Sequence, residues 1–420
     1  MISYEITGGT KLSGKIKIAG NKNAILPIMA ACLLTRETCI LQDVPQIVDV
    51  EVMSELLALA GAQIEKDGND LKITCAEIKS VEFPQELTQK LRASALLLGP
   101  MLARIGKINL GHPGGDVIGR RPLGTHIQAL QALGAKIKDG DFYEGTAKNL
   151  TGADIFLEEA SVTATENTIM AAALASGTTK LRRAASEPHV IDLCEFLVKM
   201  GAKISGIGSN VLTIVGVKSL NGTTFAVRPD HIEVGTFAIL AAVASSKLEM
   251  SPVIKEDVEM ILLTLSKFGV KYKLEKNTLT VFESKLIAAE KVVTDVWPGF
   301  PTDLMAPMIV LASQAKGATI LHDWMYESRM FFVDKLLSMG AKVEIADPHR
   351  VLVYGPAKLT GQRLDTPDIR AGIALVIAAL CANGKSQIDR AELIERGYEN
   401  IVERLSSLGA QIERIELNAH

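Results

Sequence analysis

The sequence predicts an α/β protein of two domains, built from six copies of one β-α-β-α-β-β unit with three copies in each domain. Length, an internal repeat and a set of strongly apolar helices support this prediction. The chain has 420 residues, of which 48% are hydrophobic. A chain of this length exceeds what one hydrophobic core normally organises, so we expect two cores.

A short phrase of the form apolar-Gly-small-polar-apolar recurs along the whole chain. One copy reads Met200-Gly201-Ala202-Lys203-Ile204, and successive copies are 67 to 73 residues apart. The glycines of the phrase are Gly61, Gly134, Gly201, Gly269, Gly340 and Gly409. A fixed period of this kind is typical of a repeated supersecondary unit. The spacing fits six such units into the chain.

Each repeat contains two helical patterns of different character. The first is apolar on nearly all sides, which predicts burial. The second, such as residues 191–200, is amphipathic and stops at the glycine, after which an alternating pattern predicts a strand. The apolar helices are expected at residues 23–34, 92–103, 165–175, 232–244, 302–312 and 370–382. An open solenoid is the alternative, but helices that are apolar all round favour closed domains.

Composition excludes several classes of protein. The 45 basic and 48 acidic residues give a net charge of −3, which argues against a nucleic-acid-coating surface. The longest apolar runs, residues 24–34 and 371–382, are too short to span a membrane. The first 14 residues lack a signal-peptide pattern, so we expect a cytoplasmic protein. Five scattered cysteines indicate reduced thiols, and neither a metal nor a cofactor is expected.

Cations recur where helices are predicted to start. A cation opposes the helix dipole at that end, so its repeated placement there indicates an anionic ligand such as a phosphate or carboxylate. The residues concerned are Lys22, Arg92, Arg121, Arg329, Arg370 and Arg396. Taken singly, each arginine is better explained by a surface ion pair, and only the recurrence of six cations at equivalent places favours a ligand. Neither a P-loop nor a G-x-G-x-x-G fingerprint is present, which disfavours ATP or NAD as the ligand.

With these residues in view, the whole chain resembles the enolpyruvyl transferases. The most specific matches are residues 20–24 (Gly-Asn-Lys-Asn-Ala), 113–122 (Pro-Gly-Gly to Arg-Pro), 300–303 (Phe-Pro-Thr-Asp) and 395–398 (Glu-Arg-Gly-Tyr). These motifs are similar to the branch that uses UDP-N-acetylglucosamine rather than the shikimate-3-phosphate branch. The resemblance implies an inside-out α/β barrel in each domain. It also implies one domain of residues 22–229 that carries the Asp116 loop, another of 1–21 plus 230–420, and an active site in the cleft between them.

The resemblance also implies a reaction and a set of site residues. The family transfers the enolpyruvyl group of phosphoenolpyruvate to a sugar hydroxyl and releases phosphate. By family position, the catalytic residues are Asp116, Asp303, Lys22 and Arg396. Phosphoenolpyruvate is expected to contact Lys22, Asn23, Arg121, Arg329, Arg370 and Arg396. UDP-N-acetylglucosamine is expected to contact Arg92, Arg121, Pro122, Leu123, Gly124, Thr125, Asp303 and Met325. From the residues alone, Asp303 and Asn23 are equally read as helix caps.

The sequence departs from the family pattern at three positions. Asp116 stands where the family usually has a cysteine that serves as proton donor and as the target of fosfomycin. Because a carboxylic acid also donates protons but reacts poorly with an epoxide, we predict a working, fosfomycin-insensitive enzyme. Gly124 and Glu159 stand where the family commonly has an acidic and a basic residue, respectively. Two alternatives stay open, a shikimate-3-phosphate-type transferase and a non-catalytic ligand-binding relative.

Overall fold

The computed structural model describes residues 1–116 and 118–416, which group into two compact units. Unit 1 comprises Met1–Ala19, Asp116–Arg120 and Pro229–His420. Unit 2 comprises Gly20–Gly115 and Arg121–Arg228. The sequence assigned the Asp116 loop to the domain of residues 22–229, whereas residues 116–120 group with unit 1, because they bond to residues 327, 328 and 396 of that unit.

Each unit contains three four-stranded sheets of one topology, with a parallel pair at one edge followed by two antiparallel pairings. In unit 2 the sheets are, in spatial order, β14(Thr224–Ala226)-β3(Cys39–Gln42)-β5(Asp70–Thr74)-β4(Gln63–Asp67), β6(Glu82–Phe83)-β7(Lys107–Leu110)-β9(Tyr143–Thr146)-β8(Lys136–Asp139) and β10(Asp154–Phe156)-β11(Thr178–Arg182)-β13(Val211–Val215)-β12(Lys203–Ser205). In unit 1 they are β16(Lys271–Glu275)-β17(Thr278–Phe282)-β15(Lys247–Ser251)-β2(Ser13–Lys17), β18(Lys291–Val293)-β19(Gly317–His322)-β21(Arg350–Gly355)-β20(Lys342–Asp347) and β22(Arg363–Asp365)-β23(Lys385–Asp389)-β1(Ile2–Thr7)-β24(Gln411–Glu416). The sixfold repeat is therefore confirmed.

Three strands complete sheets whose other strands are distant in sequence. β14, near the end of the unit 2 sequence, pairs with β3 near its beginning. In unit 1, β2 pairs with β15, and β1 lies between β23 and β24. Each unit is thus a closed set of three sheets, and the solenoid alternative is wrong.

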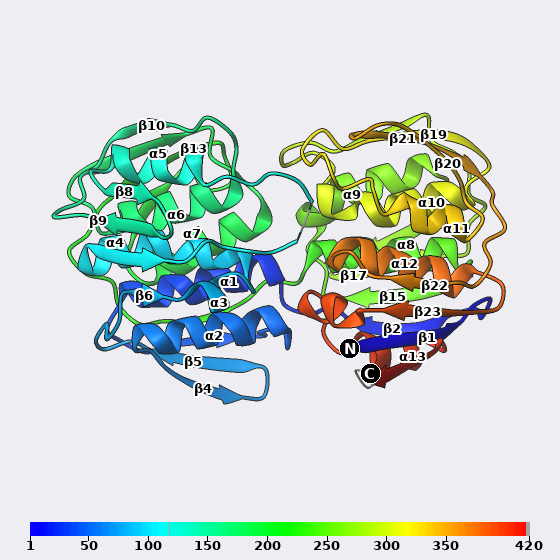
Figure 1. Ribbon diagram of the computed structural model, residues 1–420, viewed down its shortest axis with the longest axis horizontal. Helices are drawn as coiled ribbons and strands as arrows, with labels where there is room; N and C mark the ends of the chain where they lie inside the picture. The colour runs from blue at the N-terminus through cyan, green and yellow to red at the C-terminus, as the bar shows by residue number, and fades with distance from the viewer. Residues whose placement is uncertain (117, 417–420) are drawn as a thin grey trace. The chain divides into compact units, whose positions relative to one another are not determined.

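Helices occupy the interior of each unit, and the sheets surround them (Figure 1). The helices of unit 2 are α1(Lys22–Ala31), η1(Cys32–Leu34), α2(Val48–Ala60), α3(Gln85–Thr88), η2(Arg92–Leu97), α4(Leu98–Ile105), α5(Gly124–Ala132), α6(Val162–Ala173) and α7(Pro188–Lys199). Those of unit 1 are α8(His231–Val243), α9(Lys255–Lys267), η3(Thr302–Leu304), α10(Met305–Gln314), α11(Val333–Ser338), α12(Ile369–Cys381), η4(Ala391–Arg396) and α13(Ile401–Ser407). The predicted apolar helices form the core, and in α12 every residue except Cys381 is buried.

Two of the predicted apolar helices begin as 3₁₀ turns. Residues 92–97 and 302–304 are 3₁₀, and regular α-helix starts only at Leu98 and Met305. A proline lies just inside each α segment, at Pro100 and Pro307. Because proline donates no backbone hydrogen bond and its ring crowds the carbonyl four residues earlier, the α-helix cannot extend regularly into the preceding turn. Arg92 and Asp303, two of the predicted site residues, lie in these 3₁₀ turns.

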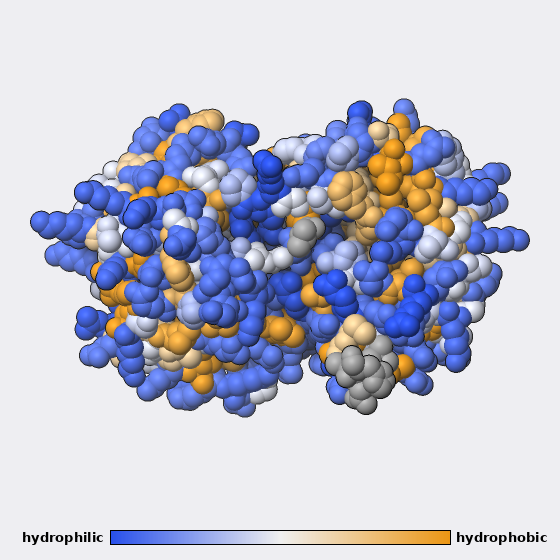
Figure 2. Space-filling model, in the orientation of Figure 1, coloured by the Kyte–Doolittle hydropathy of each residue, from blue (hydrophilic) through white to orange (hydrophobic). Residues whose placement is uncertain are grey.

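The outward faces of the sheets are exposed to solvent. Hydrophilic side chains cover most of the face seen in Figure 2, and apolar side chains gather near β19 and β20, where Ile320, Ile345 and Tyr354 are exposed. All five cysteines are free thiols, as the sequence predicted; four are buried, and Cys381 is half-buried. None of the helices in the described ranges has the length and apolarity that a membrane span requires.

Candidate active site

Asp303 of unit 1 accepts hydrogen bonds from two buried arginines. Arg370 donates to Oδ2 through Nη2 at 2.7 Å and Nε at 3.0 Å, and Arg329 donates to Oδ1 through Nη2 at 3.3 Å. Both arginines are only 4% exposed, so their charges require a nearby anion. The helix-cap alternative for Asp303 is wrong, because Pro301 occupies the cap of η3 and the carboxylate faces the guanidinium groups.

The start of α12 fixes the position of Arg370. The side chain of Asp368 caps this helix and accepts hydrogen bonds from the backbone N–H of Arg370 at 2.8 Å and of Ala371 at 2.9 Å. Arg370 also donates through Nη1 to the Tyr398 hydroxyl at 3.1 Å. Burial raises the pKa of Asp368, and the negative charge of Asp116 raises it further. The cap and the tyrosine together leave Arg370 little freedom.

Asp323 organises the segment after β19. Its carboxylate accepts hydrogen bonds from the Thr294 hydroxyl at 3.2 Å, from the Met325 backbone N–H at 3.0 Å and from the Thr302 hydroxyl. The Nε of Arg329 lies 3.9 Å from Asp323 Oδ2 but makes no hydrogen bond. Asp323 therefore fixes Met325 and one side of Arg329.

Asp116 forms an ion pair with Arg396, the last residue of η4. Asp116 Oδ1 accepts a hydrogen bond from Arg396 Nη1 at 3.1 Å. The side chains are 18% and 14% exposed, respectively, so the pair is largely shielded from solvent. Asp116 is thereby brought into the same unit as Asp303.

The backbone that follows Asp116 is held by the same unit. The carbonyl of Ile118 accepts a hydrogen bond from the Ser328 N–H at 3.1 Å, and the Arg120 N–H donates to Glu327 Oε1 at 3.0 Å. The Arg120 hydrogen bond lowers the pKa of Glu327. Gly119 lies against this carboxylate with φ +136°, and a Cβ at this position would lie 2.3 Å from Glu327 Oε2. Only glycine suits this position.

In unit 2, Lys22 forms a buried ion pair at the start of α1. Its Nζ lies 2.9 Å from Asp49 Oδ2, and the two side chains are 10% and 3% exposed. Asn21 caps the helix by accepting hydrogen bonds from the backbone N–H of Asn23 at 2.9 Å and of Ala24 at 3.3 Å. The cap alternative for Asn23 is therefore wrong, since its neighbour Asn21 has that role.

Arg92 and Arg121 lie together in unit 2, next to a buried histidine. Arg92 Nη2 donates to the backbone carbonyl of Arg121. The Nε2 of His126 lies 2.8 Å from the Thr163 hydroxyl. Burial and then the positive charges of Arg92 and Arg121 lower the pKa of His126 to about 3. The two arginines therefore add positive potential at His126, and burial is the larger cause of its lowered pKa.

The residues after Arg121 lead into α5. Leu123 is buried at the cap of this helix, and Pro122 is exposed. Gly124 begins the helix, and a Cβ at this position would meet open space, so nothing in the backbone requires glycine here. Thr125 donates from its hydroxyl to Glu159 Oε1 at 3.3 Å. Of the three departures from the family pattern, the two at Gly124 and Glu159 thus both adjoin Thr125.

The prediction that six cations lie at helix starts is correct for half of them. The residues within the first two positions of a helix are Lys22, Arg92 and Arg370. The residues outside such positions are Arg121, Arg329 and Arg396. The α-helices that follow these three residues begin only at residues 124, 333 and 401; Pro122 lies between Arg121 and its helix, and Gly397 between Arg396 and its helix. Carboxylates of the chain already pair with several of these cations. An anionic ligand is therefore not needed to explain why the cations are present.

Sequence reasoning missed four of the residues that organise these clusters. Asp49 resembles an ordinary acidic residue in the first turn of α2, and Asp323 follows a strand without any motif. Tyr398 lies within a quoted motif and Glu327 lies two residues before Arg329, but neither had an assigned role. Tyr398 had the clearest signal, because it directly follows the Glu-Arg-Gly sequence.

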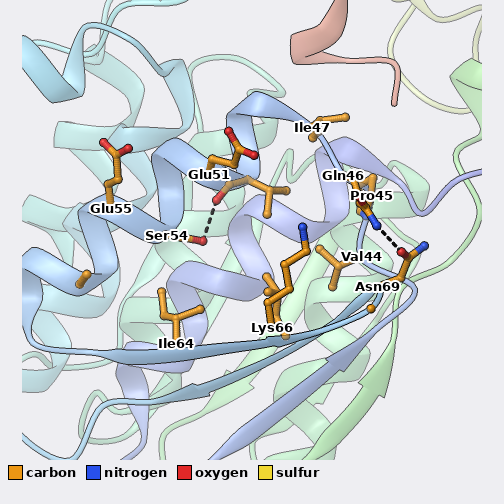
Figure 3. A pocket seen from close by; sticks show the side chains of 14 residues that line it. Val44, Pro45, Gln46, Ile47, Glu51, Ser54, Glu55, Ile64, Lys66 and Asn69 are labelled. Carbon is orange, nitrogen blue, oxygen red and sulfur yellow. Dashed lines mark hydrogen bonds between the residues drawn. The ribbon is translucent and has the colours of Figure 1, made fainter. Parts of the chain in front are cut away.

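A separate pocket of about 580 Å³ lies in unit 2 between α2 and the β4–β5 hairpin (Figure 3). Ile47, Val50 and Ile64 form part of its apolar wall, and Glu51 and Lys66 stand at its rim. None of the predicted site residues lines it. The pocket therefore does not belong to the clusters described above.

Two closed units of three repeats each, with buried arginines and lysine set beside carboxylates, define a two-domain α/β protein suited to anionic ligands. Among the described residues, no group of three or more histidine, cysteine, aspartate or glutamate side chains is arranged to hold a metal ion.

Comparison with known proteins identifies the family. Residues 6–405 match the family of EPSP synthase (3-phosphoshikimate 1-carboxyvinyltransferase). Proteins named UDP-N-acetylglucosamine 1-carboxyvinyltransferase are 49% identical in Treponema denticola (98% of this chain, 99% of the relative) and 47% identical in Bradyrhizobium diazoefficiens (99% and 98%). The chain belongs to the EPSP synthase family of enolpyruvyl transferases and, within it, to the UDP-N-acetylglucosamine 1-carboxyvinyltransferases.

Solved structures confirm the predicted fold. The enolpyruvyl transferase NikO from Streptomyces tendae aligns with a TM-score of 0.89 at 24% identity, over 98% of both chains. EPSP synthase from Acinetobacter baumannii aligns with a TM-score of 0.75 at 17% identity, over 99% of this chain and 100% of the other. The two-domain enolpyruvyl transferase fold predicted from the motifs is therefore correct.

Proposed function

We infer that this protein is a transferase that moves the enolpyruvyl group from phosphoenolpyruvate to the 3-hydroxyl of UDP-N-acetylglucosamine and releases phosphate. This is the first committed step of peptidoglycan synthesis. The observation that carries the inference is the near-full-length identity of 49% to a UDP-N-acetylglucosamine 1-carboxyvinyltransferase. The retained Asp303, Arg370 and Arg396 cluster supports it. Because both substrates are cytoplasmic metabolites, we place the reaction in the cytoplasm.

Charge and hydrogen-bonding capacity support a division of roles among the cations. Lys22, Arg121 and Arg396 contact the phosphate of phosphoenolpyruvate, and Arg329 and Arg370 contact or face its carboxylate. Asn23 contributes a further polar contact. Planar guanidinium forks match both anions, and buried donors of this kind are strong. The nucleotide sugar contacts Arg92, Thr125 and Met325, together with the segment from Arg121 to Gly124.

The two carboxylates of unit 1 support an addition and elimination sequence. Asp303 accepts the proton of the sugar hydroxyl as its oxygen bonds to C2 of phosphoenolpyruvate, and Asp116 donates a proton to C3. In the second step the ionised Asp116 takes a proton back from C3, the C2–C3 double bond re-forms, and the C2–O bond to phosphate breaks, which releases inorganic phosphate. Arg329 and Arg370 hold the Asp303 carboxylate in a fixed orientation, which is what a proton acceptor in this reaction requires.

A phosphate-release assay tests the activity directly. We expect release from phosphoenolpyruvate with UDP-N-acetylglucosamine and none with shikimate-3-phosphate. Release only with shikimate-3-phosphate would reverse the assignment of the acceptor. Binding of substrates without any release would favour the non-catalytic alternative.

We further propose that the enzyme is insensitive to fosfomycin, because Asp116 replaces the thiol that attacks the epoxide. The wild-type protein is expected to keep its activity after incubation with the drug. The variant Asp116→Cys is expected to lose activity with time and to gain the mass of one fosfomycin molecule. Covalent modification of the wild-type protein in the peptide that contains Asp116 would contradict this proposal.

A further inference from the structure

We propose that Asp116 competes with the phosphate group of the substrate for the guanidinium of Arg396. When the phosphate binds to Arg396, the Asp116 carboxylate leaves it. The proposal rests on the proposed function, since it takes Arg396 as a phosphate contact. It assigns Asp116 a second role, besides proton donation, in setting the affinity of the enzyme for anions.

The geometry of the pair supports direct competition. Asp116 Oδ1 lies 3.1 Å from Arg396 Nη1, at hydrogen-bonding distance. Carboxylate and phosphate oxygens use the same guanidinium donors. Because the Arg396 side chain is only 14% exposed, its charge is less screened than that of a surface arginine. A phosphate that binds through Nη1 competes with the Asp116 carboxylate for this donor.

Ile118 and Arg120, close to Asp116 in sequence, are held by the same unit as Arg396. The Ile118 carbonyl is held by the Ser328 N–H at 3.1 Å, and the Arg120 N–H by Glu327 at 3.0 Å. These bonds anchor the chain two and four residues beyond Asp116. An anchored group returns to its partner at a high effective concentration, which makes it a strong competitor.

A neutral residue in place of Asp116 is therefore expected to strengthen anion binding at Arg396. A charge-assisted hydrogen bond contributes an amount that corresponds to roughly a tenfold change in affinity. We expect an increase of about this size from Asp116→Asn, which keeps the shape of the side chain and removes its charge. The cysteine common in the family would impose no such cost.

Titration calorimetry with inorganic sulfate tests the proposal without the acceptor or turnover. Sulfate is a tetrahedral dianion, so it resembles the phosphate group in shape and charge and uses the same guanidinium donors. The proteins to compare are the wild type, Asp116→Asn and Glu344→Gln, the last of which removes an equal charge from the exposed strand β20 of unit 1. Arg396→Gln is combined with Asp116→Asn to complete a double-mutant cycle.

We expect about tenfold tighter sulfate binding for Asp116→Asn, no change for Glu344→Gln, and loss of the Asp116 effect in the Arg396→Gln background. Equal sulfate affinity of the wild type and Asp116→Asn, or absence of sulfate binding to both, would overturn the proposal. A different result would separate the two proposals. If Asp116→Asn binds sulfate more tightly but the wild type shows no turnover with UDP-N-acetylglucosamine, the proposed function is refuted and the competition at Arg396 stands.

Discussion

His126 is expected to make unit 2 sensitive to mild acid. Its pKa is lowered from 6.5 to about 3, first by burial and then by the charges of Arg92 and Arg121. The side chain is 2% exposed, and its Nε2 contacts the Thr163 hydroxyl at 2.8 Å. In the unfolded chain this histidine takes up a proton near its ordinary pKa, whereas in the folded protein it stays neutral.

The magnitude follows from these two pKa values. A depressed histidine pKa contributes stability that is fully present above the unfolded value of 6.5 and is lost as the pH falls toward about 3. At about pH 5.5, protonation of this histidine stabilises the unfolded chain relative to the folded protein by RT ln(1 + 10), or roughly 1.4 kcal/mol. Asp192 acts in the opposite direction, because burial raises its pKa to about 6 and its protonation stabilises the folded state in the same range.

Comparison with the variant His126→Gln isolates the contribution of this histidine. Glutamine retains an amide N–H for the Thr163 hydroxyl but does not titrate. Urea unfolding is followed by circular dichroism, and amide exchange in α5 and α6 reports unit 2 alone. As the pH falls from about 7.5 to 5.5, the free energy of unfolding of the wild type should drop by about 1.4 kcal/mol more than that of the variant. A difference that stays constant over this range would refute the reasoning, since it would mean that His126 titrates equally in both states.

Three further predictions concern the two units separately. Asp303→Asn leaves two buried guanidinium groups without their shared charge, so phosphate release should fall by at least about 100-fold and the free energy of unfolding by about 3 kcal/mol. Asn167 accepts from the Gly99 N–H at 2.7 Å inside unit 2, so Asn167→Ala should cost about 2 kcal/mol in urea unfolding. Gly119→Ala places a methyl group against the Glu327 carboxylate at a φ of +136°, which alanine rarely adopts, so turnover should fall about tenfold and the free energy of unfolding by about 1–3 kcal/mol.

Matched variants provide the controls. Asp295→Asn removes an exposed carboxylate that accepts only from the neighbouring Val296 N–H, so a loss of turnover as large as that of Asp303→Asn would show that the effect is not specific. Asn221→Ala changes an exposed asparagine of unit 2 and should leave urea unfolding unchanged. Gly140→Ala adds a methyl group with no neighbour closer than 3.9 Å. If it slowed turnover as much as Gly119→Ala, contact with Glu327 would not be the cause.

The sequence alone determined the repeat, the secondary structure classes and the family. These features are written in local patterns, namely the glycine phrase, the apolar helices and contiguous motifs such as residues 395–398. Boundaries were less accurate where proline intervened. Pro100 and Pro307 replaced the first turns of two predicted helices by 3₁₀ structure, because proline acts on the carbonyl of a preceding turn.

The sequence also named Lys22, Arg370 and Arg396 as site residues but not the carboxylate that each one meets. Only the tertiary structure decided that Lys22 pairs with Asp49, Arg370 with Asp303 and Arg396 with Asp116. The last two pairs join residues 67 and 280 positions apart. Periodicity fixes which face of one element a side chain occupies, whereas an ion pair depends on where two separate elements meet. That meeting is set by the packing of all six repeats.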